Sequence, residues 1–306
     1  MKTALVAVLA AAFVAGCAHA GEPAKPGFDI AITVDDLPDH GGLPANTTRE
    51  AIGDTYLAAL KAHGVPEAYG FVNAVGAERE PGSDVVLDHW RAAGYPLGNH
   101  TWSHVNIRQV GLAAFEADLE KGEGAVSSRM QGQDWHYLRF PFLSAGEGAD
   151  HDGIIAYLKA HGYRIADVSM SFSDWAYTEP YNRCVAKGDQ AGIEQLKTQY
   201  LAGVKAELAR ELAVSQKVYG RQISHVLLTH IGGFSALMLP QVLDVLDQAG
   251  AHYVTLSQAE SDPAYAETDA KAGDGSVMER QAGEQGIDLS GLPAGGSIAG
   301  LDQVCK

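Results

Sequence analysis

Two adjacent acids and a pair of histidines are the residues of this sequence with the clearest chemical potential. Asp35 and Asp36 follow the apolar run 29–34, and His100 and His104 lie four residues apart further along the chain. If His100 opens a helical turn, both imidazoles project from one face, about 5–6 Å apart between Cβ atoms, a spacing typical of zinc ligands. Asp36, His100 and His104 would then form a two-histidine, one-carboxylate metal site with open positions for water, as catalytic sites have.

The two acids end a segment that is predicted to be a buried strand. Ile30, Ile32 and Val34 are β-branched residues, which favour strands, and turn-forming residues follow the run. Because side chains alternate along a strand, Asp35 and Asp36 are expected to face different partners. One of them can serve as a metal ligand and the other as a base.

Strands and helices alternate along most of the chain. The predicted strands lie at 29–34, 68–74, 95–99, 136–140, 163–168, 224–229 and 252–256, and the predicted helices at 47–63, 83–93, 112–129, 152–161, 193–219 and 236–249. Seven strands alternating with helices predict a parallel α/β sheet. The candidate chemical groups follow different strands, and convergence from several strands onto one mouth favours a distorted, seven-stranded barrel over a doubly wound sheet.

Composition limits the classes of function. The chain has 306 residues, 46% of them hydrophobic, and a formal net charge of −16. This length and apolar content suffice for one large domain. The acidic balance argues against nucleic acid, or an acidic lipid surface bound through a basic patch, as a partner.

The N-terminus has the features of an export signal. Lys2 precedes the apolar run 5–14, and the segment 14–17 resembles a bacterial lipobox that ends on Cys17. Residues 1–17 are therefore expected to be a lipoprotein signal peptide with Cys17 as the lipidated residue, and 18–28 a short tether. The protein would be anchored by lipid at the periplasmic face or outer membrane of the cell envelope; cleavage after residue 20, giving a secreted protein, is the alternative.

Export changes how the other two cysteines are interpreted. In an oxidising compartment Cys184 and Cys305 can form one disulfide, the alternative being two free thiols. Residues 261–306 are rich in Gly, Ala, Asp and Glu and weakly patterned, which predicts a surface-hugging or partly disordered tail. The disulfide would pin this tail to the loop that follows Trp175.

Five segments, in order, resemble the motifs of the polysaccharide deacetylase family, also known as NodB-homology proteins or family 4 carbohydrate esterases. They are Thr33-Val34-Asp35-Asp36, His100-Thr101-Trp102-Ser103-His104, Arg139-Phe140-Pro141-Phe142, Asp174-Trp175 and Leu228-Thr229-His230. The resemblance implies a single NodB-type domain over 29–260, folded as a deformed (β/α) barrel.

The resemblance also implies roles for ten of the motif residues. Asp35 would be the general base, oriented by Arg139, and His230 the general acid, oriented by Asp174. Asp36, His100 and His104 would hold a divalent metal, with zinc as the expected ion. The remaining positions would serve the substrate: the backbone N–H of Phe142 would face the oxyanion, and Trp175 and Leu228 would form an apolar wall for the acetyl methyl group.

The implied reaction is hydrolysis of N-acetyl groups on an envelope or extracellular polysaccharide by metal-activated water, with no protein partner. The sequence departs from the family pattern at Val34, Leu37 and Phe142. These departures keep open a non-carbohydrate amide or an O-acetyl ester as substrate, or a catalytically inactive sugar-binding lipoprotein. Asp39 and His40 follow the first motif and are candidates to line the mouth of the site.

Overall fold

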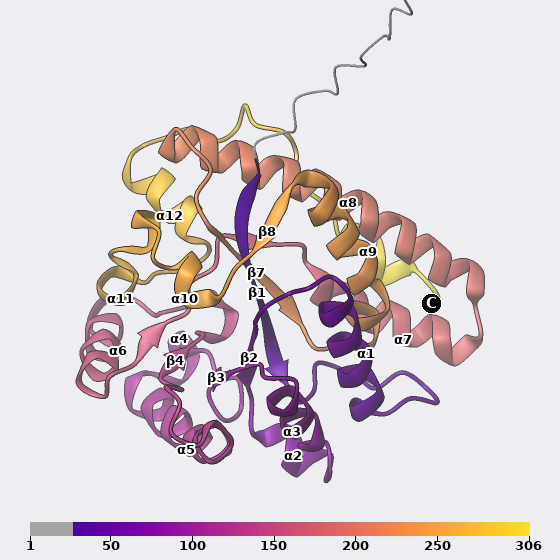
Figure 1. The fold of residues 1–306 in the computed structure, drawn as a ribbon, viewed down its shortest axis with the longest axis horizontal. Helices are drawn as coiled ribbons and strands as arrows, with labels where there is room; N and C mark the ends of the chain where they lie inside the picture. Colours follow the sequence, from indigo (N-terminus) through magenta and orange to yellow (C-terminus); the bar gives the residue numbers. More distant parts are fainter. Residues whose placement is uncertain (1–26) are drawn as a thin grey trace, which may run out of the picture.

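The computed structural model describes residues 27–306, so the predicted signal peptide, Cys17 and most of the tether lie outside the described residues. Within them, eight parallel strands form one sheet that curves into a partial barrel surrounded by helices (Figure 1). The strands are β1 (Phe28–Leu37), β2 (Ala68–Val72), β3 (Leu97–Asn99), β4 (Tyr137–Leu138), β5 (Arg164–Ile165), β6 (Met170–Ser171), β7 (His225–His230) and β8 (Ala251–Tyr253).

The strand order confirms the predicted α/β barrel class. Seven strands follow one another in the order β5-β4-β3-β2-β1-β7-β6, and β8 pairs with the start of β1. The barrel is open between β5 and β6, the two ends of this order. The two-residue strand β6 has no counterpart among the predicted strands, because so short a segment carries no periodicity.

The parallel register brings the motif residues to one edge of the sheet. Asp35 on β1 is aligned with His230 on β7, and Asn99, just before His100, is aligned with Leu138, just before Arg139. Because every strand runs the same way, the residues that follow the strands meet at the carboxyl edge, where ligand sites of such folds form.

Helices cover the outside of the sheet. They are α1 (Arg49–Ala62), α2 (Val75–Arg79), α3 (Val85–Ala92), α4 (Ile107–Val110), α5 (Leu112–Met130), α6 (Gly148–Ala160), α7 (Thr178–Lys187), α8 (Gln190–Tyr219), α9 (Gly233–Ala249), α10 (Leu256–Ala259), α11 (Thr268–Lys271) and α12 (Val277–Glu284). Short 3₁₀ turns occupy Pro141–Leu143, Asp174–Tyr177, Pro263–Tyr265 and Leu301–Gln303. In the described part of the chain, no helix combines the length and the apolar character that crossing a membrane requires.

The central strand β1 is buried on both faces. Ile32 and Val34 belong to the large cluster that packs against α1 and α9, and they are 1% and 0% exposed. Ala31 points to the opposite face and packs in a second cluster with the aromatic rings of Tyr69 and Phe71. A run that is apolar at nearly every position therefore marks a strand enclosed from both sides.

The C-terminal segment 261–306 is more ordered than its composition predicts. The side chain of Val277 is 2% exposed, and its backbone N–H donates to the carbonyl of Val168 at 2.8 Å. The N–H of Ile165 donates to Asp269 at 2.7 Å. These bonds attach the segment to β5 and to the loop before β6, so it packs along the open side of the barrel.

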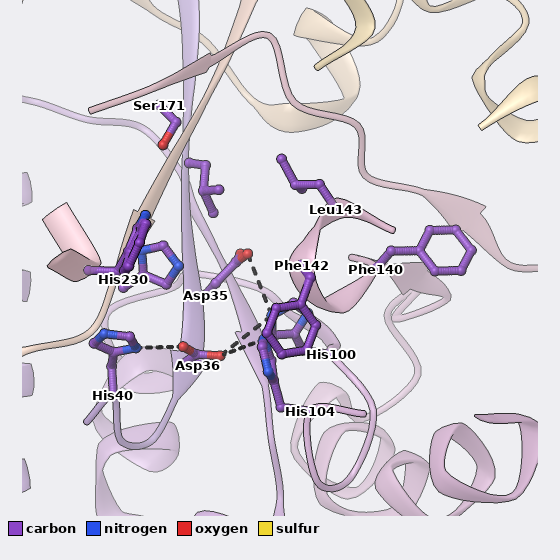
Figure 2. A pocket seen from close by; sticks show the side chains of 12 residues that line it. Asp35, Asp36, His40, His100, His104, Phe140, Phe142, Leu143, Ser171 and His230 are labelled. Atoms are coloured by element: carbon purple, nitrogen blue, oxygen red, sulfur yellow. Dashed lines mark hydrogen bonds and ion pairs between the residues drawn. The ribbon is translucent and has the colours of Figure 1, made fainter. Parts of the chain in front are cut away.

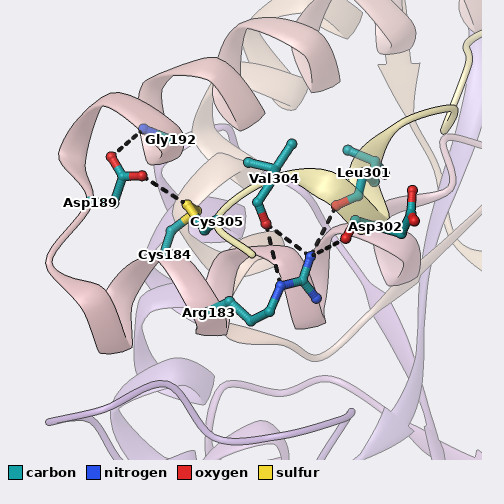
Figure 3. Close-up of a disulfide and its surroundings, with 8 residues drawn as sticks. All are labelled: Arg183, Cys184, Asp189, Gly192, Leu301, Asp302, Val304 and Cys305. Atoms are coloured by element: carbon teal, nitrogen blue, oxygen red, sulfur yellow. Dashed lines mark hydrogen bonds between the residues drawn. A yellow bond between two sulfur atoms is a disulfide. The ribbon is translucent and has the colours of Figure 1, made fainter.

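A disulfide joins Cys184 on α7 to Cys305, the penultimate residue (Figure 3). Arg183, beside it, donates to the carbonyl oxygens of Leu301 and Val304, both at 3.0 Å. The C-terminus is therefore held against α7 by a covalent bond and by hydrogen bonds from the neighbouring guanidinium group.

Candidate active site

A cavity of about 490 Å³ opens at the carboxyl edge of the sheet (Figure 2). Its lining combines acids and imidazoles with apolar side chains: Asp35, Asp36, His40, His100, His104, Phe140, Phe142, Leu143, Ser171, Trp175, Leu228 and His230. Eight of the ten motif residues proposed from the sequence lie in this lining. The other two, Arg139 and Asp174, lie behind it and contact Asp35 and His230.

The two acids reach the same cavity because β1 is irregular at its end. The pairing of β1 with β2 shifts register between Val34 and Leu37, and Asp36 has a left-handed backbone with φ of 66°. This turn of the backbone brings neighbouring side chains to one cavity, whereas a regular strand would point them to opposite faces. The two acids still have different partners, Arg139 for Asp35 and His40 for Asp36.

Leu37, one of the three departures from the motif pattern, points away from the cavity. Its side chain is 0% exposed and packs in the core beside Gly70, where an added Cβ would lie 2.9 Å from it. The bulk of Leu37 is therefore accommodated inside the fold, opposite a residue without a side chain.

The helical turn that was predicted for His100 is wrong. Residues 100–106 form a loop, in which Thr101 and His104 have φ values of 60° and 59°. Asp118 on α5 holds this loop by accepting hydrogen bonds from the N–H and hydroxyl of Ser103 at 2.9 and 2.8 Å. The two imidazoles converge because of this bent loop, and their ring centroids lie 4.8 Å apart.

Asp36, His100 and His104 fit a divalent metal. Oδ1 of Asp36 lies 3.5 Å from Nε2 of His100 and 3.6 Å from Nε2 of His104, and this buried oxygen has no hydrogen-bond partner among the described residues. One ligand atom from each residue falls within 4.8 Å of the others. A buried carboxylate oxygen without a donor is costly, and two nitrogens with one oxygen form a set that suits zinc.

The protonation of the two histidines agrees with this interpretation. Burial, opposed in part by Asp36, lowers the pKa of His100 to about 4, and burial together with the neighbouring His100 lowers the pKa of His104 to about 4. Nδ1 of His100 lies 2.7 Å from the carbonyl oxygen of Arg139, which selects the tautomer with the proton on Nδ1. Nε2 of His100 is then free to act as a ligand, and the lowered pKa keeps the ring of His104 unprotonated, as a ligand must be.

Asp35 is held by a buried arginine. Nη1 of Arg139 donates to Oδ1 and Oδ2 of Asp35 at 3.0 and 3.2 Å, and the guanidinium also donates to the hydroxyl of Thr33 and the carbonyl of Ala166. Asp35 is 2% exposed, and this burial raises its pKa, against the opposing effects of Arg139 and His230. The carboxylate is thus fixed, shielded from water and more basic than a surface aspartate, as a general base requires.

His230 is oriented by Asp174. Nδ1 of His230 lies 2.9 Å from Oδ1 of Asp174, while the backbone N–H of His230 and the hydroxyl of Ser235 donate to Oδ2 at 2.8 and 2.7 Å. Burial opposes the charged form of His230, but the charge and hydrogen bond of Asp174, with smaller effects of Asp36 and Asp35, raise its pKa to about 9. The ring therefore carries a proton near neutral pH and presents Nε2 to the cavity.

Two exposed aromatic rings stand at the cavity, Phe142 at 62% exposure and Trp175 at 49%. Phe142 has a left-handed backbone with φ of 59°, and its ring centroid lies 4.5 Å from that of His104. Leu228 lies deeper and is 7% exposed. Together these side chains give the cavity an apolar wall beside its polar floor.

Beyond the motif residues, sequence reasoning found one residue of the site and missed others. It named Asp39 and His40 as candidates for the mouth, but only His40 lines the cavity, where its Nδ1 lies 2.6 Å from Oδ2 of Asp36. Ser171 lines it from β6, the strand that carried no pattern. Asp118 supports the histidine loop from α5, 15 residues after Ser103, and no local sequence pattern predicts this contact.

Comparison with known proteins agrees with this geometry. Residues 23–166 match the model of the polysaccharide deacetylase family, a segment that includes Asp35, Asp36, His100, His104 and Arg139. Asp174 and His230 lie beyond the matched segment. A search of curated protein sequences found no match.

Solved structures with the same fold include a polysaccharide deacetylase from Bacillus cereus, with a TM-score of 0.51 and 16% identity over 74% of this chain and 91% of that chain. A family 4 carbohydrate esterase pseudoenzyme from Bacillus anthracis gives a TM-score of 0.52 and 14% identity over 76% of this chain and 65% of that chain. A family 4 carbohydrate esterase from Streptomyces lividans, solved with acetate, gives a TM-score of 0.49 and 15% identity over 76% of this chain and 95% of that chain. The family match over residues 23–166 and the (β/α) fold agree with each other, and together they are consistent with a divergent member of the polysaccharide deacetylase family.

Proposed function

We propose that this protein is a metal-dependent deacetylase that hydrolyses N-acetyl groups of an envelope or extracellular glycan. The observation that carries the proposal is the position of His100 and His104 beside Oδ1 of Asp36, a buried oxygen with no hydrogen-bond partner in the described part of the chain. Asp35 and His230 line the same cavity. A ligand set, a buried carboxylate and a protonated imidazole are the parts that hydrolysis of an unreactive amide needs.

The residues of the chain divide the proton transfers between them. Asp35 would take a proton from the attacking water, and a positioned base typically contributes about 10²–10⁴-fold to the rate. As the C–N bond breaks, His230 would give the proton on Nε2 to the leaving nitrogen, because an amine does not leave as its anion. The products are acetate and a free amino group on the sugar.

The metal and the substrate-facing groups complete the proposal. A divalent ion on Asp36, His100 and His104, which we take to be zinc, would polarise the acetyl carbonyl and lower the pKa of water. The backbone N–H of Phe142 would donate to the developing oxyanion. Trp175 and Leu228 would exclude water around the acetyl methyl group, in keeping with their position in the cavity lining.

The proposed location is the cell envelope. It rests on the lipobox-like segment that ends on Cys17, which lies outside the described residues. The Cys184–Cys305 disulfide supports export, because disulfides persist in oxidising compartments and are rare in the cytosol. A lipid anchor on Cys17 would place the cavity within reach of envelope glycans.

The test is acetate release from a panel of N-acetylated glycans that includes peptidoglycan and chitooligosaccharides, with and without a chelator. We expect chelator-sensitive release from at least one glycan, and a loss of at least about 100-fold in turnover for Asp35→Asn with metal content unchanged. Release of acetate from an O-acetyl ester alone, or stoichiometric metal with no acetate from any substrate, would contradict the proposal. A sugar-binding protein would keep its affinity in Asp35→Asn and have no turnover to lose.

A further inference from the structure

The carboxylate of Asp36 has two oxygens in two different environments. Oδ1 faces the Nε2 atoms of His100 and His104 and has no hydrogen-bond partner among the described residues. Oδ2 lies on the other side, 2.6 Å from Nδ1 of His40 (Figure 2). A proton on Nδ1 of His40 makes this contact a charge-assisted hydrogen bond, which is short and strong.

His40 is itself fixed by the structure around it. Its backbone N–H donates to the carbonyl of Ile231, just after β7, at 3.0 Å. Its carbonyl oxygen accepts from Nη1 of Arg49 at 3.4 Å, and Nη2 of Arg49 donates to the carbonyl of Gly41 at 2.7 Å. Arg49 is 5% exposed and is paired through two hydrogen bonds with Glu80. The loop that carries His40 is thus tied to β7 on one side and to α1 on the other.

We propose that His40 is a positioning residue that makes Asp36 present a single oxygen, Oδ1, to the metal. This inference rests on the proposed metal site. His40 follows the first motif of the family resemblance and belongs to none of its motifs. An aspartate that is free at Oδ2 can rotate and offer either oxygen or both, and the hydrogen bond from His40 removes that freedom before the metal binds. The gain appears as metal affinity, because partners of metal ligands are typically worth about 10–100-fold.

A second contact of His40 must be separated from this role. Its ring centroid lies 4.8 Å from that of His230, with the planes tilted by 44°. Loss of the His40 ring therefore leaves His230 less tightly packed and lowers turnover by a route that does not involve the metal. Metal affinity, measured without substrate, separates the two effects.

The experiment compares two variants of similar size. His40→Asn keeps a hydrogen-bond donor near the position of Nδ1, and His40→Leu removes it. His136→Leu is the control: its Nδ1 lies 3.2 Å from Oδ1 of Asp134 in another histidine–aspartate pair, which lies outside the cavity. The zinc dissociation constant of each metal-free protein is measured by competition with a chromophoric chelator, alongside turnover at saturating zinc and the melting temperature without metal.

We expect His40→Leu to weaken zinc binding by about 10–100-fold, His40→Asn to recover most of that loss, and His136→Leu to bind zinc like the wild type. Wild-type zinc affinity in His40→Leu overturns the inference, as do equal losses in the leucine and asparagine variants. If His40→Leu does not fold, His40→Ala replaces it in the same comparison. A wild-type protein that binds no zinc would instead refute the proposed metal site, so the two failures are distinguishable.

Discussion

Asp174 determines the properties of His230 at the level of single residues. It is 1% exposed and accepts from the ring and backbone of His230 and from Ser235. These hydrogen bonds and the charge of His230 lower the pKa of Asp174 against the effect of burial. The ionised carboxylate in turn stabilises the protonated imidazole, which is the form that can donate a proton.

We expect Asp174→Asn to move the basic limb of the turnover–pH profile to lower pH. His230 must be protonated to act as the acid, so activity falls as pH rises through its pKa, which the structure raises to about 9. Without the charge of Asp174 that pKa falls, and turnover at a fixed pH on the basic side falls with it, by about tenfold when the pKa is lower by about 1. The measurement is turnover from about pH 6 to about pH 10 in both proteins at saturating zinc, a range that spans the ordinary and the raised pKa of histidine. An unchanged basic limb, in a variant with an unchanged melting temperature, would contradict the assignment of His230.

The identities of the site residues could be predicted from the sequence, but their backbone conformations could not. Asp36, Thr101, His104 and Phe142 all have φ between 59° and 66°, a region that costs non-glycine residues about 1–2 kcal/mol each. Their side chains give little sign of this conformation, since only aspartate and histidine among them are enriched in it. Tertiary contacts impose it, and this is why the spacing of the two histidines predicts a helical turn where the structure has a loop.

At the level of elements, α5 acts as the support of the histidine loop. The carbonyl of Asp118 accepts from the N–H of Trp102 at 2.9 Å, while its side chain holds Ser103. Gly122, one turn along, allows the close approach: an added Cβ would lie 3.0 Å from Oδ1 of Asn99 and 3.2 Å from the nitrogen of Trp102. The helix and the loop therefore pack backbone against backbone.

We expect Asp118→Ala to weaken zinc binding by about tenfold and to lower the free energy of unfolding by about 1–3 kcal/mol, because two hydrogen bonds to a carboxylate are lost. Glu116→Ala, which removes an acid from the same helix, is the control. Chelator competition and urea unfolding give the two quantities. Zinc affinity equal to that of the control variant would show that the loop holds its shape without Asp118.

Most helices and long strands lie near their predicted positions, because apolar periodicity and terminal glycines mark them. The exceptions are informative. The helices α7 and α12, of ten and eight residues, were not predicted, because neither shows a long apolar repeat. The strand β6 is two residues long, and the helices α2 and α4 span five and four residues. Elements this short are held by their neighbours, and their own sequence carries no period to detect.

For the molecule as a whole, the C-terminal segment 261–306 covers the side of the barrel that is open between β5 and β6. Val277 is buried, the N–H of Gly275 donates to the carbonyl of Leu143 at 3.1 Å, and Arg108 bridges Glu147 and Asp274 at 2.8 and 2.7 Å. Leu143 lines the cavity, so this segment also supports one of its walls. Composition alone could not predict this, because the attachment combines a few specific polar contacts with separate buried apolar side chains such as Val277 and Met278, which form no long periodic run.

We expect the double variant Cys184→Ser/Cys305→Ser to lose about 2–5 kcal/mol of unfolding free energy, because the bond constrains an unfolded chain across a long sequence separation, here 121 residues. Urea unfolding of the variant, with the wild type in the presence and absence of a reductant, measures the loss. The double substitution avoids leaving one unpaired thiol, since Cys184 is 0% exposed. Equal unfolding midpoints for oxidised wild type and variant would mean that the hydrogen bonds of Arg183 suffice.

The exposed ring of Trp175 gives the cavity an optical reporter. The chain has four tryptophans, all within the described residues, and Trp175 is 49% exposed, while Trp90 is 0% exposed. A glycan that entered the cavity would remove water from the Trp175 indole and move its fluorescence emission to shorter wavelength. Titration of Asp35→Asn, which would bind without turnover, could then rank candidate glycans by affinity, with Trp175→Phe as the spectroscopic blank.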